Sequence, residues 1–247
     1  MSGAGDGARR PGSGNGRPST PPSADSLEAT PRRFWLAGAT GFLGSHLCRD
    51  LRTRGHQVIA VSRRGGDAVA ALDVCDKDEV AVSARGCDGA FLCTGKVSRD
   101  PADAEQLHRH NVVATRNALA GLRQAGVRRV VVASTSGTIA VSSDASQIAD
   151  EESSAPMDLI ARWPYYRSKL YGEREALGAN APEFEVVIVN PSLLLGPGDL
   201  QGSSTIDVQR FLERAIPAVP AGGIAFVDAR DAATGMRLAF EHGRPGE

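Results

Sequence analysis

The stretch GATGFLG, residues 38–44, is the feature that most constrains the fold of this chain. It follows RFWLA, an apolar run typical of a buried strand, and runs into LGSHLCRDLRTRG, whose spacing predicts a helix ending at Gly55. A strand-to-helix turn with glycine at every third position leaves backbone N–H groups and open space at the helix N-terminus. The stretch therefore predicts a phosphate-binding turn, with a glycine corner that binds nothing as the alternative.

Each glycine of this turn has its own expected role. Gly38 allows a sharp turn after the strand, Gly41 leaves room where a pyrophosphate would come closest, and Gly44 allows the helix to pack tightly on the strand. The spacing is GxxGxxG rather than the commoner GxGxxG, but its place after the first strand of a βαβ unit favours a dinucleotide. The residues expected to contact the cofactor here are Gly38, Gly41, Phe42, Leu43 and Gly44.

Apolar strand-like runs and helical patterns alternate along the chain after this turn. The strand-like runs are short, continuous and β-branched, which is typical of a parallel sheet covered on both faces. Asp76 and Glu79 resemble a capping box, and Pro164 suits a first helical turn. We therefore predict an α/β fold, a Rossmann doubly wound parallel sheet. The further expected strands are 57–64, 68–74, 87–95, 128–135 and 184–192, and the further expected helices are 77–86, 103–126 and 164–178.

Composition divides the chain and excludes several classes of partner. Residues 1–31 are rich in Gly, Pro, Ser and Arg and predict a disordered tail, residues 32–190 predict the dinucleotide-binding domain, and residues 191–247 a partial substrate-binding region. The net charge of −1 and the absence of a long basic run argue against nucleic acid and membrane surfaces. The four cysteines have no metal-ligand spacing, and no secretory signal is evident. We expect a cytoplasmic protein without a metal.

The end of the second expected strand indicates which cofactor binds. A carboxylate there would hold the ribose 2′-hydroxyl of NAD, whereas arginine would accept the 2′-phosphate of NADP. The strand ends with Arg63 and Arg64, and the first acid is Asp67, so NADP is favoured, although NAD remains possible. Asp73, after the third expected strand, is either an acceptor for the adenine amino group or an ordinary turn residue.

The stretch YYRSK places Tyr165 and Lys169 four residues apart, on one face of the expected helix. A lysine ammonium beside the tyrosine favours the phenolate and lowers the phenol pKa, so that Tyr165 would exchange a proton with a substrate oxygen. Tyr166 faces about 100° away in an α-helix. The preceding strand ends in a hydroxyl-rich stretch, and Ser134, Thr135 or Ser136 would hydrogen-bond the reacting oxygen.

Several further stretches carry a family resemblance: LDVCD, NVVATRNAL, AGVRRVVVASTSGT, YYRSKLYGE, VVIVNPSLLLGPGD and FVDARDAA. With them the chain, from about Arg32 onward, resembles an extended short-chain dehydrogenase/reductase of the NAD-dependent epimerase/dehydratase group. Its motifs are most similar to those of the dihydroflavonol-4-reductase-like branch. The resemblance implies a catalytic set of Thr135, Tyr165 and Lys169, with threonine where the family more often has serine. It also implies cofactor contacts by Arg63, Asp73, Val74, Thr94, Gly95, Pro191 and Ser192.

The same resemblance carries an expectation about the C-terminal region. Relatives usually continue for several dozen residues past FEHGRPGE, and those residues help to build the substrate domain. We therefore expect an incomplete substrate-binding lobe and an exposed apolar face where the rest would pack. The likeliest substrate-facing loop is residues 140–163, and the resemblance implies a homodimer.

Three functions fit these observations. The first is an NADP-dependent oxidoreductase that interconverts a carbonyl and a secondary alcohol of a small molecule. The second is a sugar-nucleotide epimerase or dehydratase with tightly bound NAD. The third is a protein that binds NADP without catalysis, which leaves the Tyr165–Lys169 pair unexplained.

We predict that the purified chain binds NADPH and that Arg63→Ala loses this binding, because the arginine would pair with the 2′-phosphate. The measurement is a titration with NADPH and with NADH that follows quenching of the Trp35 and Trp163 fluorescence. A variant that binds NADPH as tightly as the native chain would contradict this role of Arg63.

Overall fold

The computed structural model describes residues 30–200, 202–218 and 221–247, so the predicted tail at 1–31 falls almost entirely outside the described residues. Pro31–Glu247 form one compact unit. Its strands are β1 (Arg33–Ala37), β2 (Gln57–Ser62), β3 (Ala70–Ala71), β4 (Gly89–Leu92), β5 (Arg129–Ala133), β6 (Glu185–Val189), β7 (Leu193–Leu195) and β8 (Phe226–Asp228). Its helices are α1 (Phe42–Thr53), α2 (Lys77–Ser83), η2 (Pro101–Asp103), α3 (Ala104–His108), η3 (Arg109–Val113), α4 (Ala114–Gln124), η4 (Ser136–Thr138), α5 (Met157–Ile160), α6 (Pro164–Ala179), α7 (Thr205–Leu212) and α8 (Ala229–His242).

The central sheet has six parallel strands in the order β3-β2-β1-β4-β5-β6. This is the strand order of a doubly wound Rossmann sheet, so the predicted fold class is confirmed. Strands β7 and β8 form a separate parallel pair. Because all six strands run the same way, the loops that follow them emerge at one edge of the sheet.

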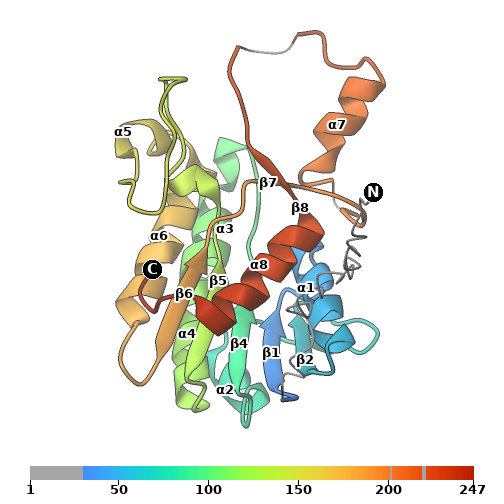
Figure 1. Cartoon of the computed structure of the whole chain (residues 1–247), viewed down its shortest axis with the longest axis vertical. Coiled ribbons are helices and arrows are strands. Elements are labelled where there is room, and N and C mark those ends of the chain that lie inside the picture. The colour runs from blue at the N-terminus through green and yellow to red at the C-terminus, as the bar shows by residue number, and fades with distance from the viewer. Residues whose placement is uncertain (1–29, 201, 219–220) are drawn as a thin grey trace, which may run out of the picture. The chain divides into compact units, whose positions relative to one another are not determined.

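Successive residues of each strand point to opposite faces of the sheet, and each face is covered by helices (Figure 1). Phe34 and Leu36 join a cluster with apolar residues of α1 and α8. Trp35 and Ala37 join a second cluster with residues of α2, α4 and α6. Burial on both faces explains why the strand segments are continuously apolar rather than alternating.

Two predicted elements differ from the structure. The strand expected at 68–74 is only Ala70–Ala71. Before it the chain turns between Gly66 and Val69, and after it the backbone N–H of Cys75 donates to Asp73 Oδ1 at 3.0 Å and turns the chain again. The helix expected at 103–126 is interrupted by the π-helical turn η3. That turn contains Asn111, whose carbonyl oxygen lies 2.3 Å from where a Cβ on Gly172 of α6 would stand. The turn therefore lies where two backbones approach closely.

The predicted starts of two helices are confirmed. Asp76 caps α2, and its Oδ1 accepts from the backbone N–H groups of Asp78 at 2.9 Å and Glu79 at 3.1 Å. Pro164 occupies the first turn of α6, where its missing N–H removes no helical hydrogen bond.

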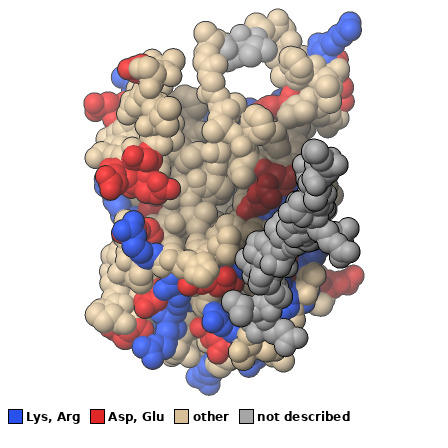
Figure 2. Space-filling model, in the orientation of Figure 1, with Lys and Arg blue, Asp and Glu red and all other residues tan. Residues whose placement is uncertain are grey.

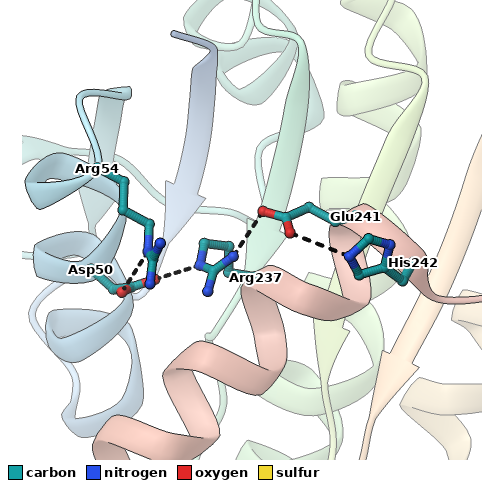
Figure 3. Close-up of polar contacts among 5 residues, drawn as sticks. All are labelled: Asp50, Arg54, Arg237, Glu241 and His242. Carbon is teal, nitrogen blue, oxygen red and sulfur yellow. Dashed lines mark hydrogen bonds and ion pairs between the residues drawn. The ribbon is translucent and has the colours of Figure 1, made fainter. Parts of the chain in front are cut away.

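Helix α8 lies beyond the boundary predicted at residue 190, yet it packs on the large sheet and on α1. An ionic network joins it to α1 (Figure 3). Arg237 Nε lies 2.9 Å from Asp50 Oδ2, and Arg237 Nη1 lies 2.9 Å from Glu241 Oε1. Arg54 also contacts Asp50, at 3.2 Å. These pairs connect the first helix of the unit to its last.

The segment around α7 exposes apolar side chains. Phe211 is 60% exposed and Leu212 is 75% exposed. A groove of about 510 Å³ runs between α7 and β7, lined by Leu195, Gly196, Thr205, Val208, Gln209, Leu212 and Glu213. Figure 2 shows few charged side chains in the middle of this face of the molecule and many at its lower end.

We predict that Arg237→Ala lowers the free energy of unfolding by about 2–4 kcal/mol, because it leaves Asp50 and Glu241 less well paired in a largely buried site. The matched control is Arg230→Ala, also in α8, whose side chain is 65% exposed and pairs with Asp228. An exposed pair contributes less than about 1 kcal/mol. Urea denaturation of both variants is the measurement, and equal losses would contradict the prediction.

Candidate functional site

The glycine turn joins β1 to α1, and two of its glycines are required by the fold. Gly38 has a φ of 81°, and a Cβ there would lie 2.6 Å from the Cys93 carbonyl oxygen at the end of β4. A Cβ on Gly44 would lie 2.1 Å from the Gly38 carbonyl oxygen, so α1 packs directly on the turn. Close backbone packing therefore explains Gly38 and Gly44 without any bound ligand.

Gly41 differs from these two glycines. The one neighbour that a Cβ on Gly41 would meet within 4 Å is the Gly38 carbonyl oxygen, at 3.1 Å. Gly41 is also the N-cap of α1, and no side chain caps that helix. Phe42 and Leu43 form the first helical residues, with Leu43 buried. The N-terminus of α1 therefore offers backbone N–H groups that no side chain caps, which suits a pyrophosphate.

Basic side chains lie after β2 and on the facing helical segment. Arg63 and Arg64 are exposed, and Arg63 Nη1 lies 3.3 Å from His110 Nε2 in η3. Burial and then the charge of Arg63 lower the pKa of His110. Asp73 is exposed and uses Oδ1 in its turn with Cys75, which accounts for it as a turn residue and leaves Oδ2 accessible.

The residues expected around the other end of the cofactor follow β4 and β6. Gly95 is exposed, and a Cβ there would lie 3.8 Å from Lys169 Nζ. Pro191 accepts a hydrogen bond from the backbone N–H of Ser136 at 3.0 Å, which ties the end of β6 to η4. Thr94 and Ser192 are partly buried and complete this group, and Val74, expected beside Asp73 at the adenine, is also partly buried.

Helix α6 begins at Pro164 and presents Tyr165 and Lys169 to the ends of β4 and β5. Lys169 Nζ donates to the carbonyl oxygen of Ala133, the last residue of β5, at 2.7 Å. Tyr166 instead packs its ring over Gly137, where a Cβ would lie 2.0 Å from the ring. The two tyrosines therefore have different surroundings: Tyr165 has Thr135 as a hydrogen-bond partner, and Tyr166 fills space between α6 and η4.

Burial shifts the pKa values of this pair in opposite directions. Burial and the neighbouring Tyr166 raise the pKa of the Tyr165 phenol to about 12, and the Thr135 side chain, as a hydrogen-bond partner, opposes the rise. Burial lowers the pKa of Lys169 to about 8, and the charge of Glu173 opposes that fall. Both shifts favour the neutral form. The expectation that Lys169 lowers the pKa of the Tyr165 phenol is therefore wrong for the protein without a cofactor, because burial outweighs any effect of the lysine. At pH 7 the phenol therefore keeps its proton, and the lysine keeps most of its charge.

The three candidate hydroxyls after β5 have different environments. Thr135 caps η4 through its side chain, which accepts from the Gly137 N–H at 3.3 Å, and it affects the Tyr165 pKa. The Ser134 hydroxyl is buried and has no hydrogen-bond partner among the described residues. Ser136 is partly buried. Thr135 is the one of the three that interacts with the tyrosine.

Sequence analysis missed two polar residues of this region. Asn111 is buried, and its side chain bonds both the N–H and the carbonyl of Lys96 and the hydroxyl of Ser168. Glu173 is buried in α6, one turn beyond Lys169. In the sequence, each of the two is a polar residue on the apolar face of a predicted helix, and that pattern could have identified both.

Two kinds of feature are absent from the described part of the chain. None of its helices combines the length and the apolar character needed to cross a bilayer. No three His, Cys, Asp or Glu side chains gather there in a way that would hold a metal ion.

Comparison with known proteins was made on sequence and on structure. Residues 35–247 match the model of the NAD-dependent epimerase/dehydratase family. A dihydroflavonol 4-reductase-like protein of Synechocystis sp. is 36% identical over 220 residues, which cover 85% of this chain and 64% of that protein. A 2-alkyl-3-oxoalkanoate reductase of Stenotrophomonas maltophilia is 32% identical over 191 residues, covering 74% and 56%. The chain thus spans less than two thirds of the length of both curated relatives.

Solved structures of similar fold include MoeE5 in complex with UDP-glucose and NAD. It superposes with a TM-score of 0.72 at 26% identity, over 85% of this chain and 72% of that one. A structure of that protein therefore holds a nicotinamide cofactor and a sugar nucleotide on the same fold.

We predict that Lys169 titrates near pH 8 in the cofactor-free protein, because burial disfavours its ammonium form. The chain has three lysines, so NMR of protein labelled with ¹³C at lysine Cε follows each one. We expect one signal with a midpoint of about 8, and we expect that signal to vanish in Lys169→Met. If the signal that is lost in the variant, and so belongs to Lys169, titrates in the native chain at the ordinary lysine pKa of about 10.4, the burial effect is contradicted.

Proposed function

The chain belongs to the NAD-dependent epimerase/dehydratase family, and on that premise we propose that it is an NADP-dependent oxidoreductase that interconverts a carbonyl and a secondary alcohol. The observation that carries the proposal is the arrangement of Tyr165 and Lys169 on one face of α6, with Lys169 Nζ bonded to the end of β5 and facing Gly95. Both residues lie at the edge of the sheet where parallel folds bind ligands. Two relatives described as reductases support the same reaction class.

The state of the side chains favours carbonyl reduction as the direction of proton transfer. With a pKa of about 12, the Tyr165 phenol is protonated at pH 7 and can donate its proton to a carbonyl oxygen that gains negative charge. The Thr135 hydroxyl would donate a second hydrogen bond to that oxygen, and the Lys169 ammonium would stabilise the phenolate that remains. A bound nicotinamide would supply the hydride.

The cofactor itself is proposed as NADP from the charges after β2. Arg63 forms no ion pair with a carboxylate among the described residues, and its guanidinium lies in hydrogen-bond contact with the His110 ring. An arginine without a paired carboxylate is favourably placed to accept the 2′-phosphate. The N-terminus of α1, which no side chain caps, would receive the pyrophosphate.

A second candidate is a sugar-nucleotide epimerase or dehydratase with tightly bound NAD. The likeness to MoeE5, solved with UDP-glucose and NAD, is the observation that favours it. Such an enzyme recycles its cofactor instead of releasing it. Absorbance of cofactor in the freshly purified protein, without added nicotinamide, would support this candidate over the first.

We predict that Tyr165→Phe lowers kcat for carbonyl reduction by about 10²–10⁴-fold, because it removes the proton donor. The dissociation constant for NADPH should stay within about twofold, because the ring remains. The matched control is Tyr166→Phe, which keeps the ring packed on Gly137 and should retain turnover. Turnover and fluorescence titration are the measurements, and a Tyr165→Phe variant of native activity would overturn the assignment.

A further inference from the structure

Glu173 is a buried carboxylate that the proposed reaction does not use. It lies in α6, one helical turn after Lys169, and only 8% of the residue is exposed. Burying a carboxylate is unfavourable unless hydrogen bonds or charges compensate for the lost water. The contacts of Glu173 therefore indicate what the buried charge does.

One oxygen of Glu173 binds two polar side chains from different elements. Glu173 Oε1 accepts from the Thr138 hydroxyl at 2.8 Å and from Asn190 Nδ2 at 2.7 Å. Thr138 ends η4, and Asn190 follows β6. Asn190 Nδ2 also lies 3.0 Å from Thr138 Oγ1, so the three side chains form one cluster.

This cluster holds the backbone of Thr135. The Thr135 carbonyl oxygen lies 2.8 Å from Thr138 Oγ1 and 3.1 Å from Asn190 Nδ2. The Thr138 hydroxyl has a single proton, which Glu173 and the Thr135 carbonyl share. Glu173 of α6 thus fixes the backbone of Thr135 through the side chains of Thr138 and Asn190.

The same carboxylate also acts on the lysine. Lys169 and Glu173 are four residues apart and share a helix face. Burial lowers the pKa of Lys169, and the charge of Glu173 is the first influence that opposes the fall. A neutral residue at position 173 would therefore leave a smaller fraction of Lys169 charged at pH 7–8.

We propose that Glu173 is a positioning residue of this site, which fixes Thr135 through Thr138 and Asn190 and places a negative charge beside Lys169. The inference rests on the proposed function and extends it to a residue that touches neither substrate nor cofactor. The two effects are separable, because Gln at position 173 keeps a hydrogen-bonding oxygen and removes the charge, whereas Val at position 138 removes a hydroxyl and keeps the charge.

The first experiment compares Glu173→Gln with the native chain. The Lys169 midpoint, followed by lysine Cε NMR in the cofactor-free protein, should fall by at least about half a pH unit. The pH at which kcat begins to decline on the alkaline side should fall by a similar amount. The affinity for NADPH should stay within about twofold of the native value. The matched control is Glu175→Gln, two residues further along α6, which pairs with Arg116 at the surface and should change neither midpoint nor kcat.

The second experiment uses Thr138→Val. Kcat should fall about tenfold to a hundredfold because Thr135 loses one of its two anchors, while the Lys169 midpoint moves by less than in Glu173→Gln. A purely structural role would lower the melting temperature of both variants and leave the midpoint and the pH profile unchanged, and that result would overturn the proposal. If Glu173→Gln fails to fold, Thr138→Val and Asn190→Ala, with the same readouts, decide the positioning role.

The proposed reaction and the role of Glu173 can each be contradicted without the other. If the native chain turns over no carbonyl substrate but the Lys169 midpoint falls in Glu173→Gln, the proposed reaction is wrong and the charge effect of Glu173 stands. If the native chain is active and both variants keep the native midpoint and kcat, the proposed function stands and the role of Glu173 is wrong.

Discussion

The parallel sheet, buried on both faces, is the constraint on which the rest of the structure depends. Its strands must all end at the same edge, so loops that are distant in sequence meet there. The glycine turn after β1, Gly95 after β4, Thr135 after β5 and Pro191 after β6 are linked in this way. The fold thereby produces a ligand-binding edge before any functional side chain is considered.

Desolvation at this edge gives the side chains their chemistry. Tyr165 and Lys169 lie one turn apart, and burial pushes the pKa of the phenol up and that of the ammonium down. The two pKa values, which are similar for free tyrosine and lysine side chains, thereby move apart to about 12 and about 8, although both groups remain in their ordinary protonation states at pH 7. In the proposed reaction the protonated phenol is therefore the proton donor. The buried carboxylate of Glu173 limits how far Lys169 shifts.

Sequence reasoning succeeded where the signal was local. The order of strands and helices, the cap at Asp76 and the start of α6 at Pro164 follow from apolar periodicity and from residues with restricted backbone chemistry. It failed where packing between distant elements decided the outcome. The π-helical turn at Asn111 has no local signal, since it lies where α6 approaches the backbone. The place of α8 on the large sheet is likewise a long-range result.

The sequence by itself determined the fold class, the glycine turn and the pairing of Tyr165 with Lys169 on one helix face, because helix and strand periodicities are properties of neighbouring residues. Only the tertiary structure decided which hydroxyl lies beside the tyrosine, which basic side chain joins Arg63, and which carboxylate is buried behind Lys169. Those outcomes depend on how three or more elements pack together. Burial and the distances between charges exist only after that packing is complete.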